Sequence, residues 1–136
     1  MREVRLESGA VGYITYWRID PTARNTLQKD GRNISVRSLF FDLDPIAWKA
    51  GGGWPTYTVP CPHPENGGSG FDYSGFKRHC IVATMGSGII DLFEICYAGK
   101  QTISRNGRGK VTFEVNDNGS NDNTGYFDVN MYGFQS

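Results

Sequence analysis

Short apolar stretches separated by turn-forming residues run along the whole chain, and this pattern constrains the fold more than any other feature. No segment of about 12 residues keeps the 3.6-residue apolar repeat of an amphipathic helix, and Gly or Pro interrupts most candidates. Strands are predicted instead at 12–19, 34–42, 80–85, 89–96, 110–116 and 126–132. Strands this short and this numerous predict an all-β protein built as a sandwich of two antiparallel sheets.

The length and charge of the chain exclude several classes of protein. The 136 residues suit one domain, 1–136, with a sizeable core. Lys plus Arg equal Asp plus Glu at 14 each, so no overall field attracts nucleic acid or an anionic membrane. No apolar run is long enough for a signal peptide or a membrane span. We therefore expect a soluble protein made in the cytoplasm, which leaves open its release to the cell exterior.

Two stretches near the C-terminus, 110–115 and 126–131, alternate apolar and polar residues most clearly. Such alternation is typical of strands with one buried face. The two strands are predicted to pair as a hairpin around the polar loop between them, or to be joined by that loop as a connection between sheets. The residues expected on the buried faces are Val111, Phe113, Val115, Phe127, Val129 and Met131.

The middle of the chain, 50–75, is irregular and holds many glycines and 4 of the 6 prolines. Structureless segments this long are uncommon and are usually functional or mobile. The three cysteines, Cys61, Cys80 and Cys96, form no CxxC pair and are interpreted as small buried hydrophobic residues, with one disulfide as the alternative.

The loop 115–126, VNDNGSNDNTGY, is rich in carboxylates and amides. Calcium takes six to eight such oxygens from a flexible loop. The loop contains no His or Cys for a soft metal, and its spacing differs from that of an EF-hand. A solvated surface turn uses the same residue types, so both interpretations stay open. The oxygen donors are Asp117, Asn118, Asn121, Asp122 and Asn123.

Three motifs together resemble the bacterial galactophilic lectins of the PA-I type. They are Asn116-Asp117 followed by Asp122-Asn123-Thr124-Gly125, then Gly53-Trp54-Pro55-Thr56-Tyr57, and more weakly His63-Pro64-Glu65-Asn66-Gly67. The resemblance covers about residue 34 to the C-terminus. It implies a jelly-roll-like, galactose-binding-domain-like β-sandwich that binds galactose through Ca²⁺, usually as a homo-oligomer, a tetramer or dimer.

The resemblance also implies roles for particular residues. Asp117, Asp122 and Asn123 would bind Ca²⁺ through side chains, and Tyr57 and Ser120 through backbone carbonyls. Two hydroxyls of galactose would complete the shell, with Asp117 and Asp122 accepting hydrogen bonds from them. The sugar would also contact Tyr57, His63 and Asn66.

The sequence departs from this family in two places. The 118–121 turn is shorter than the family's, which leaves the carbonyl ligand undecided. Counting without gaps makes His63 an ordinary loop residue and moves the sugar contact to 71–73, where Phe71 and Tyr73 would form an exposed platform or be tucked under the loop. Trp54 is expected to pack in the core rather than stack on sugar, and His79 to be structural.

Two other functions compete with a lectin. One is a β-sandwich with a structural calcium site that binds no sugar. The other is a small glycoside-acting enzyme, but no nucleophile elbow, zinc-protease motif or phosphate loop is present. We therefore expect a binding protein, with galactose-containing glycans as its partners, and no enzyme.

Overall fold

The computed structural model describes residues 2–5, 9, 11–29, 31–86 and 88–135. Within these residues nearly all regular structure is β-strand, which confirms the all-β prediction, and no helix is long and apolar enough to cross a bilayer. The two helices are single 3₁₀ turns, η1 (Ile89–Asp91) and η2 (Ser120–Asp122). The strands are β1 (Arg2–Arg5), β2 (Val11–Ile19), β3 (Asn25–Thr26), β4 (Gln28–Lys29), β5 (Arg32–Asn33), β6 (Ser35–Lys49), β7 (Thr56–Tyr57), β8 (Ile81–Met85), β9 (Leu92–Ile95), β10 (Gly99–Val115) and β11 (Thr124–Gln135).

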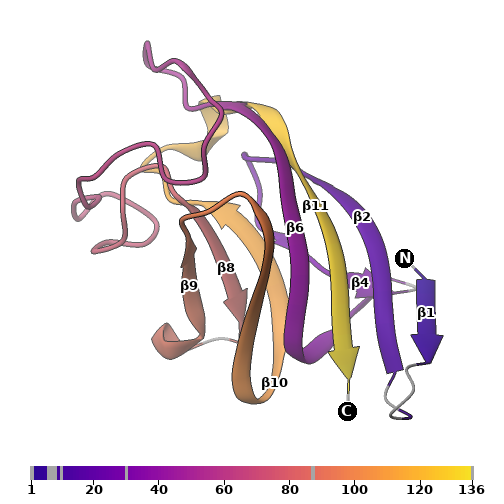
Figure 1. Ribbon diagram of the computed structural model, residues 1–136. Helices are drawn as coiled ribbons and strands as arrows, with labels where there is room; N and C mark the ends of the chain where they lie inside the picture. Colours follow the sequence, from indigo (N-terminus) through magenta and orange to yellow (C-terminus); the bar gives the residue numbers. More distant parts are fainter. Residues whose placement is uncertain (1, 6–8, 10, 30, 87, 136) are drawn as a thin grey trace.

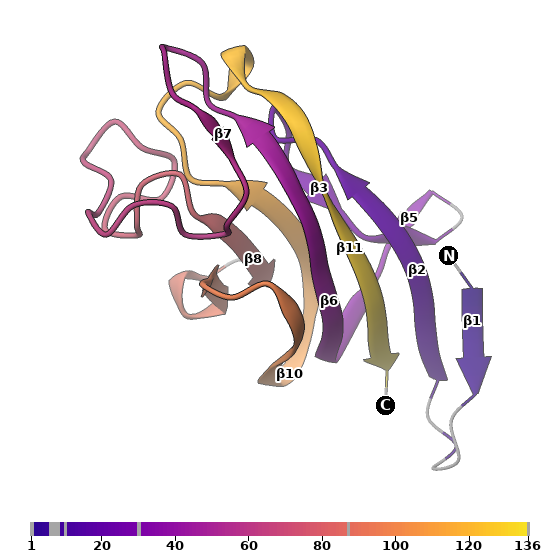
Figure 2. The same ribbon diagram turned by 45° about the horizontal axis from the view of Figure 1, so that its top comes forward.

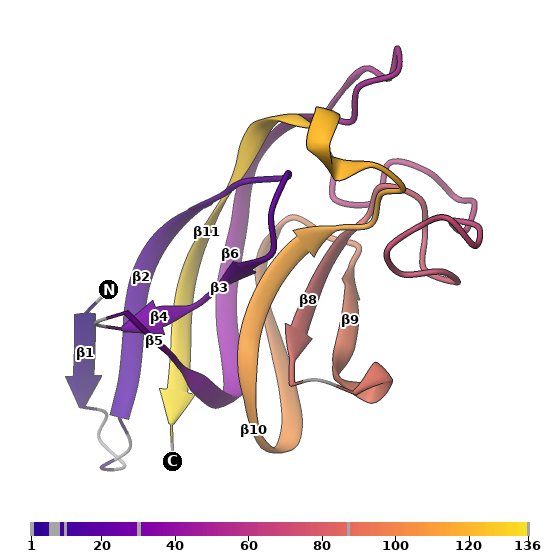
Figure 3. The ribbon, with the colours of Figure 1, turned by 180° about the vertical axis from the view of Figure 1, so that it is seen from behind.

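One long strand, β10, connects the two layers of the fold. Its first half pairs with β6 in the layer β1-β2-β11-β6, and its second half pairs with β8 and β3 in the layer that β9 completes. The register shifts between Ser104 and Gly109, and at this corner β10 bends sharply from one layer into the other (Figure 1). Seen from behind, the second half of β10 rises beside β8 (Figure 3).

The corner requires a glycine. At Gly109 the backbone of β10 passes so close to the Met85 carbonyl that a Cβ would overlap it. Beyond this corner the two layers face each other and bury one apolar cluster. Phe41 of β6 and Phe113 of β10 meet there edge to face, with ring centroids 5.8 Å apart. Such packing of two antiparallel layers is the sandwich-like arrangement that the sequence predicts.

The predicted pairing of 110–116 with 126–132 is wrong, although the predicted buried faces are confirmed. β11 pairs with β2 and β6, and β6 therefore separates β11 from β10. The polar loop between β10 and β11 consequently connects the layers, which is the other arrangement expected for it. Residues buried on the predicted faces are Val111, Phe113, Val115, Phe127, Val129 and Met131.

The predicted strand at 89–96 is shorter than expected. Its first three residues form η1, and Ile89 and Ile90 are exposed rather than paired. The chain becomes a strand only at Leu92, where β9 pairs with β8. The irregular segment 50–75 contains only β7, which pairs with the end of β6.

Candidate functional site

Three loops gather at one end of the two layers. The hairpin loop between β6 and β7, the long segment after β7 and the β10–β11 loop with η2 lie at the same end (Figures 1 and 2). Backbone hydrogen bonds join two of them, because the N–H of Asp72 donates to the Asp117 carbonyl at 2.8 Å. The loop that the sequence singles out is therefore packed against others rather than free in solvent.

A small pocket of about 170 Å³ opens between the β6–β7 hairpin loop and the β10–β11 loop. Asp117 and Asp122 both line it, from opposite ends of the 118–121 turn. Gly51 has a φ of 76° and its backbone lies against the Asp122 carboxylate, where a Cβ would stand 2.5 Å from Oδ2. Only glycine meets both requirements. The full lining is Ala50, Gly51, Gly52, Trp54, Asp117, Asn118, Gly119, Asn121 and Asp122.

The carboxylate of Asp117 is buried and only partly satisfied. Its Oδ1 accepts the backbone N–H of Asn118 at 2.7 Å and lies 3.5 Å from Nε2 of His79. Its Oδ2 is buried without a hydrogen-bond partner among the described residues. A buried carboxylate oxygen without a partner costs folding free energy, and a cation bound beside it would offset that cost.

A hydrogen-bonded chain leads from Asp117 through two histidines. The Tyr57 hydroxyl lies 2.7 Å from Nδ1 of His79 and 2.9 Å from Nε2 of His63. The carboxylate of Asp117 can only accept, so the facing Nε2 of His79 carries the proton. Nδ1 of a neutral His79 then accepts from the Tyr57 hydroxyl, whose oxygen accepts the N–H of His63. Nδ1 of His79 and the Tyr57 hydroxyl are thereby satisfied, whereas Oδ2 of Asp117 is not.

Burial favours the neutral forms of His79 and Tyr57. Burial lowers the pKa of His79 despite the opposing influence of Asp117. It also raises the pKa of Tyr57 to about 12, and the Asp117 charge acts in the same direction. His79 is the one non-glycine residue with positive φ in the described part of the chain, at 56°. Such backbone strain persists only where the surroundings hold it in place.

Aromatic side chains enclose the histidines. Trp54 contacts the rings of His63 and His79 edge to face, at centroid distances of 4.9 and 5.1 Å. Trp54 also packs against the core, as expected, while one edge lines the pocket. This packing restricts the orientations that the two imidazoles can take.

Asn116 fixes the long loop beside the site. It is fully buried; its Oδ1 accepts the N–H of Tyr73, and its Nδ2 donates to the carbonyls of Tyr73, Phe76 and Lys77. Its own carbonyl accepts the N–H of His79. The residue before Asp117 thus positions both the loop and His79.

Two other predicted calcium ligands, Tyr57 and Asn123, lie outside the pocket lining. Asn123 is buried; its Nδ2 donates to the Pro21 carbonyl at 2.9 Å, and its Oδ1 has no partner among the described residues. Ser120 begins η2, and Tyr57 is buried at the pairing of β7 with β6. The structure therefore brings Asp117 and Asp122 to one pocket and leaves Tyr57 and Asn123 outside it.

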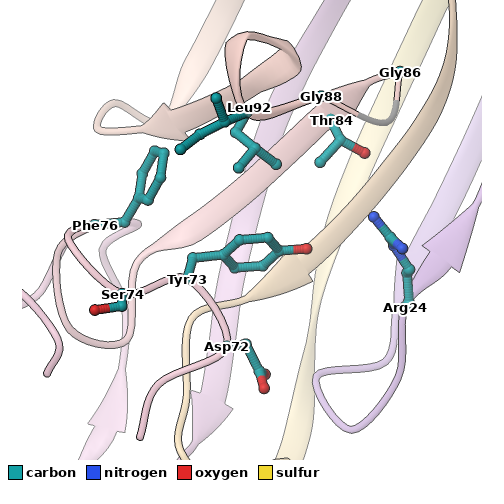
Figure 4. A pocket seen from close by; sticks show the side chains of 10 residues that line it. Arg24, Asp72, Tyr73, Ser74, Phe76, Thr84, Gly86, Gly88 and Leu92 are labelled. Carbon is teal, nitrogen blue, oxygen red and sulfur yellow. The ribbon is translucent and has the colours of Figure 1, made fainter. Parts of the chain in front are cut away.

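The predicted sugar contacts His63 and Asn66 also lie outside that lining. His63 is half-buried and bound to Tyr57, whereas Asn66 is exposed and its backbone bridges Lys77. The alternative sugar contact at 71–73 lies outside this pocket lining as well. Asp72 and Tyr73 line a different hollow of about 320 Å³, where the Tyr73 ring extends toward the side of Arg24 (Figure 4). Phe71 is half-buried, and its ring lies against Gly67.

No group of three His, Cys, Asp or Glu side chains suited to a metal occurs in the described ranges. Calcium also uses amide and carbonyl oxygens, which such a group leaves out. The donors here are oxygens, and two of them, Asp117 Oδ2 and Asn123 Oδ1, are buried without a partner within the described structure. This donor set fits a hard cation and not a soft one.

Sequence reasoning missed the central position of His79 and the anchoring role of Asn116. A histidine directly before a buried strand and an asparagine directly after one were the available signals. Comparison with known proteins adds no relative: no family model, no curated protein and no solved structure matches the chain.

Proposed function

We propose that this chain is a calcium-dependent carbohydrate-binding protein that recognises terminal galactose. The observation that carries the proposal is the buried, unpartnered Oδ2 of Asp117 beside a pocket that Asp122 shares. A divalent cation bound there would stabilise both carboxylates, which otherwise repel each other. The three motifs shared with the galactophilic lectins support calcium as the cation and galactose as the ligand.

The proposed ligands are the side chains of Asp117, Asp122 and Asn123 and the carbonyls of Tyr57 and Ser120. Asn123 offers Oδ1, the second oxygen without a partner in the described structure. Because Tyr57 and Asn123 lie outside the pocket lining, binding by all the proposed ligands requires a local change in the loops around the pocket. Gly119 and the short η2 turn are local structure that can change at small cost.

Bound calcium would supply coordination positions for two neighbouring hydroxyls of galactose. Asp117 and Asp122 would accept hydrogen bonds from the same hydroxyls, and bonds to charged acceptors are the stronger kind. The edge of Trp54 in the pocket gives an apolar surface beside them. His63 and Asn66 are the proposed further sugar contacts, and no covalent bond is made or broken.

One isothermal titration with galactose, run in calcium and repeated in chelator, tests the proposal. Binding in calcium, its loss in chelator and its recovery with excess calcium are expected. Asp122→Ala should abolish metal and sugar binding together, while Asn130→Ala, at an exposed position of β11 outside the pocket lining, should retain both. Galactose binding that survives chelation would contradict the mechanism.

The same experiment separates the two competing functions. A structural calcium site would raise the melting temperature in calcium while galactose produced no heat. A glycoside-acting enzyme would release nitrophenol from nitrophenyl galactosides, with turnover lost in a carboxylate variant. A single shallow pocket gives weak binding, so we also propose a homo-oligomer that presents several sites, which light scattering would measure.

A further inference from the structure

The three cysteines, far apart in sequence, lie close together at the end of the β8–β9 pair where β8 begins and β9 ends. Ile81 pairs with Ile95, so Cys80 and Cys96 leave neighbouring strands at the same level. The carbonyl of Pro60 accepts the N–H of Ile81 at 3.0 Å, which brings the next residue, Cys61, to the same place. The Sγ of Cys61 lies 3.3 Å from the Sγ of Cys96.

The three thiols differ in their access to solvent. Cys96 is exposed and Cys61 is half-buried, whereas Cys80 is fully buried. The expectation of three buried hydrophobic residues therefore holds for Cys80 alone. A dissolved reagent can reach Cys96 and Cys61, and these are the two sulfurs in contact.

The surroundings favour Cys61 as the thiolate. A hydrogen bond from the Cys80 thiol is the main influence lowering the pKa of Cys61, and one from Cys96 adds to it, while burial opposes both. Lys77 acts in the same direction from its ion pair with Glu94, where Nζ and Oε1 are 3.6 Å apart. Burial raises the pKa of Cys96, which leaves it as the proton-bearing partner. The thiolate is the reactive form of cysteine.

We propose that Cys61 and Cys96 form a thiol–disulfide exchange site whose substrate is a small-molecule disulfide. The Cys61 thiolate attacks one sulfur of the substrate, forms a mixed disulfide and expels the other half as a thiolate. The Cys96 thiol, on losing its proton, attacks Sγ of Cys61 and expels the second half. Two protein thiols are oxidised to one disulfide, and one substrate disulfide is reduced to two thiols.

This bond would tie the loop that carries His63 to the end of β9. The Sγ of Cys61 lies 3.3 Å from the Ile95 carbonyl, to which the protonated thiol donates, so the loop already contacts β9 before any bond forms. Oxidation then needs little movement of the backbone. The site is separate from the calcium pocket, whose lining contains no cysteine.

The test is oxidation of the full-length reduced protein with oxidised glutathione in chelator, followed by quenching with iodoacetamide. Digestion with trypsin and a Glu-specific protease cuts at Lys77, Arg78 and Glu94 and so separates the three cysteines. We expect a Cys61–Cys96 linked peptide, with Cys80 alkylated only after denaturation. A Cys61–Cys80 link, or no link over the full range of glutathione ratios, would overturn the proposal.

Three variants assign the roles. Cys96→Ser should accumulate a mixed disulfide with one glutathione on Cys61, because the second step is blocked. Cys61→Ser should react far more slowly at Cys96, whereas Cys80→Ala should still form the link, although more slowly, because it removes the main hydrogen bond that favours the Cys61 thiolate. Equal reactivity of Cys96 with and without Cys61 would contradict the assignment of Cys61 as nucleophile. Because chelator is present throughout, the outcome does not depend on calcium or galactose binding.

Discussion

The Tyr57 hydroxyl lies 2.7 Å from Nδ1 of His79, and this hydrogen bond connects β7 to the segment just before β8. Tyr57→Phe keeps the ring but leaves both histidines without their shared partner. Because unpaired buried groups are costly, we expect a loss of about 1–3 kcal/mol in the free energy of unfolding. Urea denaturation measures this loss. Tyr132→Phe, which removes an exposed hydroxyl from β11, is the control, and equal stability of the two variants would contradict the prediction.

The contact between Gly51 and Asp122 gives a second prediction. Two glycine variants with similar backbone strain should differ in calcium affinity, because only one of them disturbs the pocket. Gly51→Ala and Gly53→Ala both place alanine at positive φ, 76° and 86°, and each should cost about 1–2 kcal/mol of stability. Only at residue 51 does the new Cβ meet the Asp122 carboxylate, whereas residue 53 faces open space. Under the proposed function, Gly51→Ala should weaken calcium binding about tenfold, or about 1.4 kcal/mol, relative to Gly53→Ala. Calcium titrations on both variants measure it, and equal affinities would place the metal elsewhere.

The alternation of residues such as Phe113 and Phe127 was enough to predict the buried faces and the fold class. It could not predict pairing, because β10 and β11 both pair with β6, and alternation carries no information about which strand lies between two others. The predicted strand ends at residue 42, whereas β6 continues to Lys49, because Asp44-Pro45 is a sequence typical of a turn. The structure places these residues at a register shift, the kind of position where a strand tolerates proline.

The candidate site was predicted in part for a related reason. Asp117 and Asp122 stand out because oxygen donors are dense in a single loop, a local property of the sequence. His79 and Asn116 act through contacts with a loop that has no periodic pattern, so their partners emerge only once that loop is folded. The need for glycine at position 51 likewise depends on the Asp122 carboxylate, which is about 70 residues away in sequence.

Asn116 provides a third prediction, about the order of the long loop. Asn116→Ala removes four side-chain hydrogen bonds to residues 73–77 and leaves the backbone groups they satisfied exposed to water or unpaired. We expect a loss of about 2–3 kcal/mol in the free energy of unfolding. Hydrogen exchange at the Tyr73 amide should accelerate most. Asn121→Ala, in an exposed position of the neighbouring turn, should change neither quantity.

An ion pair outside the lining of the candidate pocket predicts how stability depends on acid. Arg18 donates from Nε and Nη2 to the two oxygens of Asp128, at 2.9 and 3.2 Å, while its guanidinium stacks 3.8 Å from the Tyr126 ring centroid. Burial by itself would raise the pKa of Asp128, but the hydrogen bonds from Arg18 and Tyr16 outweigh it and lower the pKa below its usual value. The unfolded chain therefore binds the proton first as the pH falls. The stabilisation is complete above the unfolded pKa of about 3.9 and is lost as the pH falls through the folded pKa.

Asp128→Asn tests this acid dependence because asparagine keeps the shape and cannot titrate. At pH 7 the variant should be less stable by about 1 kcal/mol, since Arg18 is largely exposed and solvent screens the pair. Between pH 5 and pH 2 its stability should fall less steeply than that of the native protein, by the share that Asp128 contributes. Urea midpoints across this range measure both slopes, with Asp44→Asn at an exposed position of β6 as the control. Parallel slopes for the native protein and Asp128→Asn would show that the Arg18 pair does not govern the acid response.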